Sequence, residues 1–159
     1  MLKPAILYKE ILERKFAEQL YSDDYFYYNG YAAGTTMPVE IKSQENLYQY
    51  AIVNKDNEVV GFLSYRLLPD LNEATCFGLY SFEKGNAIIG RDLFRKMEEL
   101  ISLSHRVSWK VVGGNPVKRH YDKFCLKYNG NICHEHDVTK DKYGNYHDMF
   151  TYEIINKEN

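Results

Sequence analysis

The chain has 159 residues, of which 45% are hydrophobic and 26% are charged, and its formal net charge at pH 7 is -2. These values are typical of one globular domain with its own core, and they exclude general disorder. The slightly acidic balance argues against nucleic acid and anionic membranes as partners, because both bind basic surfaces.

Residues 5–21 predict an amphipathic helix, with one apolar stripe formed by Leu7, Ile11, Leu12, Phe16 and Leu20. The next stretch, 22–38, is aromatic and has no clean periodicity, which indicates a short helix or an ordered loop. Residues 47–54 and 59–68 predict a β-hairpin closed by a polar turn. A third strand follows at 74–82.

The second half of the chain predicts a helix over 89–101 and a buried strand over 106–112. Another helix covers 117–128 and is followed by Asn129-Gly130, a typical C-terminal cap. The tail alternates in polarity over 131–138 and 147–155, which predicts two final strands.

This order of elements predicts an α/β (α+β) fold with a mixed, mostly antiparallel sheet and helices on both faces. Strands 74–82 and 106–112 have only a helix between them, so we expect them to be the one parallel pair, joined by a right-handed crossover.

A glycine-bearing turn joins the strand that ends near Tyr80 to the helix that contains Leu93. Such a junction gathers free backbone N–H groups at the positive end of a helix dipole, which is a common way to bind phosphate. The alternative is that Gly85 and Gly90 only shape the turn.

With this turn, and with four residues between Asn115-Pro116 and Tyr121, the segment 47–155 resembles the GNAT superfamily of acyl-CoA-dependent N-acyltransferases. The resemblance implies a single GNAT-like domain over 1–159. Within it, 1–46 would be a helical acceptor-side region and 47–155 the core that binds acetyl-CoA (coenzyme A) as co-substrate.

In the family, backbone amides of the turn bind the pyrophosphate of coenzyme A. Gly90 matches the family pattern, whereas Gly85 stands where Gln or Arg is usual and Ile88 replaces a central Gly. The cofactor-binding residues that the resemblance implies are Leu79, Tyr80, Gly85, Asn86, Ala87, Ile88, Ile89, Gly90, Arg91 and Asn115. Asn115 could equally be only the N-cap of the last helix.

The family also implies that the strand with Leu79 and Tyr80 splays from Val107–Val112, which frees backbone groups for pantetheine. An ordinary closed sheet is the alternative. Tyr121 matches the tyrosine that protonates the departing thiolate, although it could be a plain core residue. Glu73 is the nearest match to the family's general base, with a surface carboxylate, water or no base as alternatives.

His134 and His136 alternate on one predicted strand, with Cys133 adjacent and His147 across the hairpin. Alternating histidines can bind a metal, but this spacing matches no standard zinc signature. We therefore expect a solvated hairpin face and no metal. Cys76, Cys125 and Cys133 form no paired framework, and no signal peptide or membrane span is apparent, so we expect reduced thiols and a cytoplasmic location.

An aromatic group precedes the first predicted strand and consists of Tyr25, Phe26, Tyr27, Tyr28 and Tyr31. By resemblance this region walls the acceptor site; core packing or a homodimer surface would explain it as well.

The expected function is an N-acetyltransferase that moves an acetyl group from acetyl-CoA to a primary amine by direct attack, with Tyr121 as proton donor. The acceptor would be a small molecule or a peptide. A non-catalytic GNAT-like domain that binds CoA or a protein is the alternative. A nucleic-acid-binding module lacks the basic stripe that it would need.

Overall fold

The computed structural model describes residues 1–29 and 39–158. Its strands are β1 (Leu2–Pro4), β2 (Leu47–Val53), β3 (Val59–Leu68), β4 (Glu73–Ser81), β5 (Arg106–Val112), β6 (Asn131–Lys140) and β7 (Tyr146–Ile155). Its α-helices are α1 (Lys9–Gln19), α2 (Asp23–Asn29), α3 (Ala87–Leu103) and α4 (Lys118–Lys127), and 3₁₀ turns cover Ala5–Tyr8 and Pro69–Leu71.

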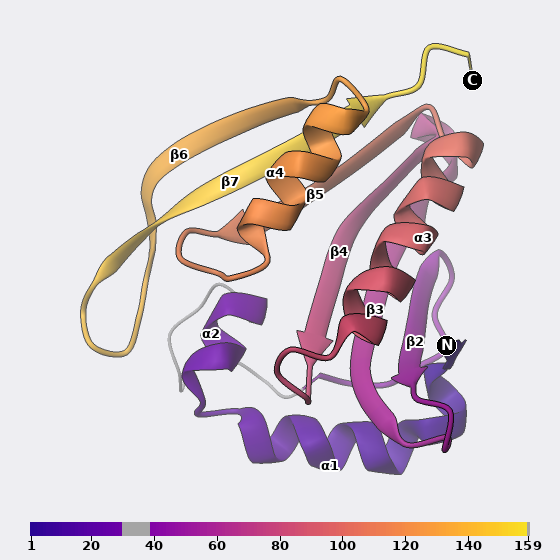
Figure 1. Ribbon diagram of the computed structural model, residues 1–159, viewed down its shortest axis with the longest axis vertical. Coiled ribbons are helices and arrows are strands. Elements are labelled where there is room, and N and C mark those ends of the chain that lie inside the picture. The colour runs from indigo at the N-terminus through magenta and orange to yellow at the C-terminus, as the bar shows by residue number, and fades with distance from the viewer. Residues whose placement is uncertain (30–38, 159) are drawn as a thin grey trace.

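The strands form one seven-stranded sheet in the order β1-β2-β3-β4-β5-β7-β6 (Figure 1). Neighbouring strands are antiparallel except for β4 and β5, which are parallel and are connected through α3. The mixed, mostly antiparallel fold that the sequence predicts is confirmed, including its single parallel pair.

Both faces of the sheet are covered by helices, so there are two hydrophobic clusters. One lies under α3 and α4 and includes Leu93, Met97, Phe124, Trp109 and Tyr152. The other lies under α1 and α2 and includes Leu12, Phe16, Tyr25, Phe62 and Tyr80. Leu63 and Tyr65 of β3 belong to the first cluster and Phe62 to the second, as the two-residue repeat of a strand requires. Val59 and Val60 are out of this phase, because the pairing of β3 with β2 shifts register beside them.

The N-terminal segment differs from its prediction. Leu12 and Phe16 are buried, but Leu7 is 71% exposed and Ile11 is 40% exposed. Ala5–Tyr8 form a 3₁₀ turn, whose three-residue repeat is out of phase with the following α-helix. The predicted stripe therefore does not continue into this turn. Strand β1, which pairs with β2 at the sheet edge, was not predicted.

Strands β4 and β5 diverge soon after they begin to pair (Figure 1). The two strands pair only where Glu73 lies opposite Arg106 and Ala74 opposite Val107. We call this paired end the vertex of the two strands. Beyond the vertex they separate, and α2 contacts both of them from one face of the sheet. The splay that the resemblance implies is confirmed.

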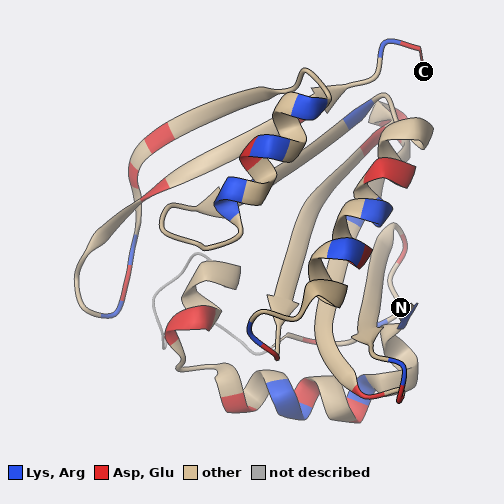
Figure 2. Cartoon of the chain, in the orientation of Figure 1, with Lys and Arg blue, Asp and Glu red and all other residues tan. Residues whose placement is uncertain are grey.

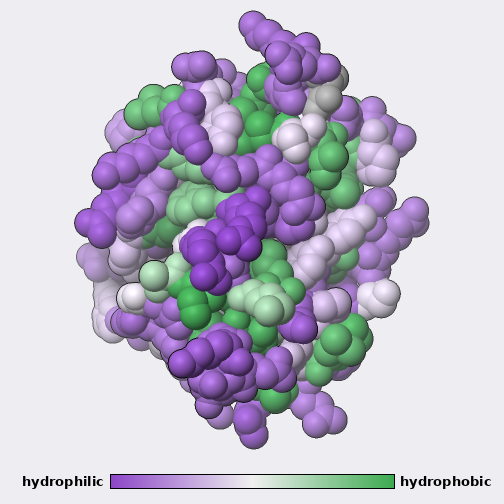
Figure 3. Space-filling view, turned by 45° about the vertical axis from the view of Figure 1, so that its right-hand side comes forward, coloured by the Kyte–Doolittle hydropathy of each residue, from purple (hydrophilic) through white to green (hydrophobic). Residues whose placement is uncertain are grey.

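No helix in the described part of the chain is long and apolar enough to cross a membrane. The three cysteines are free; Cys125 is buried, whereas Cys76 and Cys133 are exposed. On the face shown in Figure 3, hydrophobic residues reach the surface in small patches separated by hydrophilic ones. This face therefore offers no wide apolar surface for self-association.

Candidate functional site

A groove of about 450 Å³ lies where β4 and β5 separate. The end of β4, the turn after it and the first turn of α3 form one side. The other side consists of β5, the loop at Asn115–Val117 and the first turns of α4. Tyr27 and Tyr28 of α2 complete the lining, so the groove is bordered by elements from both faces of the sheet.

The turn between β4 and α3 is built around Gly85 and Asn86. Gly85 has a φ of 76°, a left-handed conformation that glycine adopts without a Cβ clash. The Asn86 side chain caps α3, because its Oδ1 accepts a hydrogen bond of 3.0 Å from the backbone N–H of Ile88. Asn86 also accepts a bond from the backbone N–H of Ile89 through its carbonyl oxygen.

Gly90 leaves open space at the start of α3. A Cβ built on Gly90 would meet no atom within 4 Å, among the residues that the structure describes. Gly90 lines the groove, so its bare backbone is accessible to a ligand there. This is the position at which the turn matches the family pattern.

The groove brings together most of the residues that the sequence singled out. Those that line it are Leu79, Tyr80, Gly85, Asn86, Ile89, Gly90, Asn115 and Tyr121. Ala87, Ile88 and Arg91 are not among the lining residues. The Ile88 side chain packs against the cluster under α3 and α4, and the Arg91 guanidinium binds Asp92 at 3.0 Å. Ile88 therefore does not obstruct the groove.

Tyr121 has a buried ring and lines the groove from α4. Its ring centroid lies 5.8 Å from that of Trp109 and 5.9 Å from that of Tyr152. Burial raises the pKa of the Tyr121 hydroxyl, and no other cause contributes. The phenol is therefore protonated at neutral pH.

Asn115 stands in the loop before α4, two residues ahead of Val117, which is the N-cap of that helix. The Asn115 Oδ1 accepts a hydrogen bond of 3.1 Å from the backbone N–H of Val117, and its carbonyl accepts one of 3.0 Å from Lys118. These bonds close the turn that leads into α4, so Asn115 is not itself the N-cap. Asn115 lines the groove, and its contact with a cofactor stays a prediction.

Glu73 lies at the vertex where β4 and β5 still pair, and it does not line the groove. Its Oε1 accepts a 2.6 Å hydrogen bond from the Ser108 hydroxyl and lies 3.6 Å from the Arg106 Nε. The Ser108 proton is thereby used, so the Thr75 hydroxyl, 2.7 Å from that of Ser108, is the donor between them. This buried network ties the two strands together, and the role of Glu73 as a base stays a prediction.

Positive side chains at the groove were missed from the sequence. Lys84, Lys110 and Arg119 line it, and Lys84 also forms an ion pair of 2.9 Å with Asp24 of α2. Figure 2 shows that the charged residues of α4 are mostly Lys and Arg. The excess of basic residues on one helix was the available signal, but the net charge of the whole chain conceals it.

The aromatic group of the N-terminal region is divided between two roles. Tyr25 and Phe26 are buried, whereas Tyr27 and Tyr28 line the groove. Tyr31 lies outside the described residues. Burial raises the pKa of the Tyr28 hydroxyl, so it remains neutral. Core packing is therefore confirmed for Tyr25 and Phe26, and the role of Tyr27 and Tyr28 as a wall of an acceptor site stays a prediction.

A smaller cavity of about 140 Å³ separates α2 from the β6–β7 hairpin. His147 lies on its wall and contacts the turn of the β6–β7 hairpin, the loop after β5 and helix α2. Its Nε2 is 2.9 Å from Asp141 Oδ2, its Nδ1 is 3.3 Å from the Gly113 carbonyl oxygen, and its ring centroid is 4.9 Å from that of Phe26. The hydrogen bond to His147 is the largest cause that lowers the pKa of Asp141.

No known sequence family matches the chain, and no protein of curated function matches it by sequence. Solved structures do match its fold. A putative phosphinothricin N-acetyltransferase is 13% identical over 98% of this chain and 97% of that one, with a TM-score of 0.65.

Two further matches are shorter. The spermidine/spermine N-acetyltransferase SpeG from Vibrio cholerae is 14% identical over 69% of this chain, with a TM-score of 0.56. An acetyltransferase from Salmonella typhimurium that modifies the N-terminal serine of ribosomal protein L7/L12 is 20% identical over 70%, with a TM-score of 0.52. In each case the match spans 65% of the other protein, which is less than two thirds of its length.

Proposed function

Because the chain has the fold of GNAT acetyltransferases, we propose that it is an N-acetyltransferase that moves an acetyl group from acetyl-CoA to a primary amine. The observation that carries the proposal is the groove between β4 and β5. It begins at the N-terminus of a helix, follows two strand edges that are no longer paired, and is lined by Tyr121.

The groove has the chemistry that a CoA ester requires. The bare backbone at Gly90 and the N-terminal end of α3 suit phosphate groups, which favour helix N-termini. Lys84, Lys110 and Arg119 add positive charge along the lining. The separated edges of β4 and β5 offer backbone groups to a chain of amides such as pantetheine.

In the proposed reaction the thioester of acetyl-CoA supplies the acetyl group. The neutral amine attacks the thioester carbonyl carbon directly, with no covalent enzyme intermediate. A C–N bond forms, the C–S bond breaks, and the nitrogen loses its extra proton to water. Tyr121 holds a proton at its hydroxyl and donates it to the leaving sulfur. Burial keeps the hydroxyl protonated between turnovers, and Tyr121 regains its proton from solvent after the step. Tyr27 and Tyr28 form the wall against which the body of the acceptor would lie.

One observation favours a second function, a GNAT-like domain that binds without catalysis. The Asn86 side chain already accepts from the Ile88 N–H, which removes one backbone donor from the turn. A turn with fewer free donors would bind pyrophosphate more weakly. The two functions differ in whether acetyl transfer follows binding.

The first test is the melting temperature of the protein with and without acetyl-CoA. A ligand at 100 times its dissociation constant adds about 2.7 kcal/mol to the stability. For a domain of this size the melting temperature should rise by roughly 5–10 °C. No rise at millimolar acetyl-CoA would contradict both the enzyme and the CoA-binding domain.

The second test measures release of free thiol from acetyl-CoA in the presence of spermidine, phosphinothricin or a peptide with an N-terminal serine. These probes represent a polyamine, an amino acid and a protein terminus. Transfer to any of them supports the enzyme. A stabilised protein that transfers acetyl to none of these or to a wider amine panel would favour the binding domain.

A further inference from the structure

The β6–β7 hairpin has an irregularity that no part of the proposed function uses. Glu135 pairs with Met149 and Thr139 pairs with His147, so three residues of β6 lie opposite the single residue Asp148. Asp137, in the middle of the three, has a φ of 53°. The bulge therefore concentrates β6 side chains around one carboxylate of β7.

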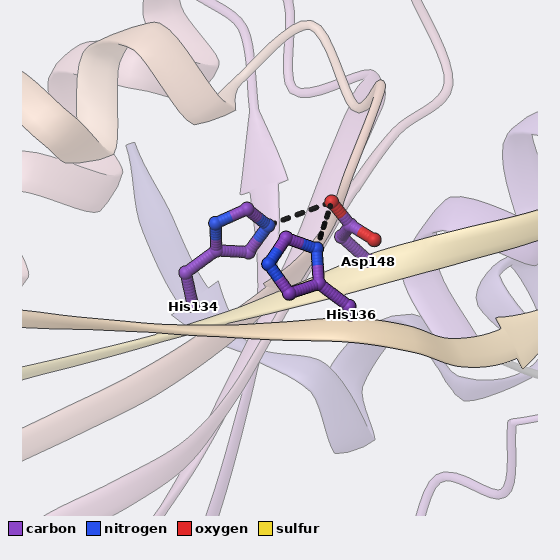
Figure 4. Close-up of side chains that lie close together, drawn as sticks. All are labelled: His134, His136 and Asp148. Carbon is purple, nitrogen blue, oxygen red and sulfur yellow. Dashed lines mark hydrogen bonds and ion pairs between the residues drawn. The ribbon is translucent and has the colours of Figure 1, made fainter.

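The carboxylate is held in a defined orientation by this bulge. The backbone N–H of Asp137 donates a hydrogen bond of 3.0 Å to Asp148 Oδ1. Asp148 Oδ2 is then directed at two imidazoles, with His134 Nε2 at 2.6 Å and His136 Nδ1 at 3.5 Å (Figure 4). The three potential ligand atoms all lie within 4.8 Å of one another.

The His134 ring is also fixed by its neighbours. It stacks on Phe150 with the ring centroids 4.3 Å apart and the planes 16° apart. The His136 ring lies 4.1 Å from it, centroid to centroid. Both imidazoles are exposed on their outer sides, at 41% for the His134 side chain and 76% for that of His136. A dissolved ion can therefore reach the cluster, and water can complete its coordination.

We propose that His134, His136 and Asp148 form a binding site for one divalent transition-metal ion of the zinc class. Imidazole nitrogen with carboxylate oxygen suits zinc, cobalt or nickel, whereas magnesium and calcium prefer oxygen ligands alone. Bonds of about 2.0–2.1 Å in a tetrahedral centre put ligand atoms roughly 3.3 Å apart, close to the spacing of this cluster. The Asp137 N–H acts as the outer contact that orients the carboxylate.

The ligand set differs from the one that the sequence brought forward. Cys133 precedes His134 by one residue, and the alternation of the strand directs its side chain to the opposite face. His147 is engaged by Asp141 and the Gly113 carbonyl. The third ligand is Asp148, which no spacing rule identifies. The proposal does not depend on the acetyltransferase function.

The site is nevertheless adjacent to the groove through the backbone. The Asp148 carbonyl oxygen accepts a 2.7 Å hydrogen bond from the N–H of Gly113, in the loop that leads to Asn115. An ion bound at the cluster would cross-link β6 to β7 at this point. We therefore expect it to raise the melting temperature of the protein.

The test uses the full chain without any polyhistidine tag, treated with EDTA and dialysed to pH 7.5. Calorimetric titration with Zn²⁺ should show one site per chain with a dissociation constant below about 100 μM. Co²⁺ should produce visible absorption bands typical of nitrogen and oxygen ligands, and Mg²⁺ should not bind at the same concentration.

His134→Ala and His136→Ala should each weaken Zn²⁺ binding by roughly tenfold or more. Glu135→Ala is the matched control, because Glu135 lies between them on the same strand and its side chain alternates to the other face. It should bind like the unaltered chain. Near-ultraviolet circular dichroism from the buried Trp109 reports whether each variant is folded.

Three outcomes would overturn the proposal. One is no Zn²⁺ binding to the unaltered chain up to about 100 μM. Another is a His134→Ala/His136→Ala double variant, shown to be folded, that binds as tightly as the unaltered chain. The third is an equal loss of affinity in Glu135→Ala, since this would assign the effect to the hairpin as a whole rather than to the ligands.

Discussion

Tyr121 combines a buried, packed ring with a place in the lining of the groove. Tyr121→Phe preserves the ring contacts with Trp109 and Tyr152 and removes only the oxygen. If the hydroxyl donates the proton to the leaving sulfur, kcat for thiol release should fall by about 10²-fold or more. KM for acetyl-CoA and the melting temperature should change little.

Tyr152→Phe is the matched control for this prediction. The Tyr152 hydroxyl donates a 2.7 Å hydrogen bond to Asp122 in the core and does not line the groove. This variant should lose about 1 kcal/mol of stability and keep its kcat. Full kcat in Tyr121→Phe would show that the proton comes from elsewhere.

Gly90 permits a test of the binding site that is separate from folding. Because open space surrounds the position of its Cβ, a side chain at residue 90 should be accommodated. Gly90→Glu would place a negative charge where phosphate is expected, so the dissociation constant for acetyl-CoA should rise by roughly tenfold or more. Calorimetry measures this change.

Gly90→Ala is the control, and it should bind acetyl-CoA within a few-fold of the unaltered chain. Both variants should match or exceed the original melting temperature, because glycine is a poor helix residue by about 1 kcal/mol. Unchanged affinity in Gly90→Glu would mean that phosphate does not lie at the start of α3.

At the scale of elements, the vertex of β4 and β5 holds the groove open by tying the strands at one end only. Glu73→Gln weakens the bond from Ser108 and the ion pair with Arg106. We expect a loss of about 1–3 kcal/mol in urea unfolding, because a buried charged network is disturbed. The kcat should change by less than about threefold, since Glu73 does not line the groove.

Glu153, the more exposed ion-pair partner of Arg106, provides the control for Glu73→Gln. Glu153 binds the same guanidinium at 3.1 Å but is 32% exposed, so Glu153→Gln should cost less than about 1 kcal/mol. A folded Glu73→Gln variant that loses its activity would restore Glu73 as a candidate general base.

The docking of the β6–β7 hairpin should depend on pH through Asp141. His147, first among several hydrogen-bond donors, lowers the pKa of Asp141 below its unfolded value near 3.9. A carboxyl with a lowered folded pKa stabilises the native state above its unfolded pKa, and this contribution is lost as the pH falls through the folded value.

Melting temperatures measured from pH 6 to pH 2 should reveal this contribution. The difference between the unaltered chain and Asp141→Asn should be constant above about pH 5 and should shrink below about pH 4. Asp70→Asn, a change at an exposed acid in the 3₁₀ turn before β4, should show no such convergence. A difference that does not vary with pH would exclude the charge of Asp141 as its cause.

The elements that could be predicted from the sequence are those with long, uniform patterns. The strand Arg106–Val112 is as predicted because it is a nearly continuous buried run. The 3₁₀ turn before α1 and the three-residue β1 were missed, since short elements carry little periodicity. A strand keeps its alternating pattern on both sides of a bulge, so the bulge in β6 cannot be recognised from the sequence. The position of Asp148 opposite the bulge, beside His134 and His136, therefore could not be predicted.

The candidate site was predictable to a similar extent. Backbone features such as Gly90 and the turn follow from the order of elements, and they meet Tyr121 in the groove. Side-chain directions do not follow from that order. Arg91 turns to Asp92, and Ile88 turns to the core, because the helix phase at its first turn decides which residues face β5.

For the whole molecule, the central question is whether the two parts of the splayed sheet unfold together. The cluster under α3 and α4 includes Val60 of β3 and Tyr152 of β7, so one core joins strands on both sides of the groove. We therefore expect a single cooperative transition in urea. Fluorescence of Trp109, the single tryptophan, should coincide with far-ultraviolet circular dichroism. An earlier loss of fluorescence would mean that β5–β7 unfold first.

The bulge in β6 also affects how the molecule meets its own copies. As the outermost strand of the sheet, β6 presents unpaired backbone groups that could recruit a strand of another chain. The interruption at 136–138 limits regular pairing along this edge, and its exposed histidine and acidic side chains oppose close stacking. Changes that straighten β6 would therefore be expected to appear first as aggregation at high protein concentration, before any loss of fold is detectable.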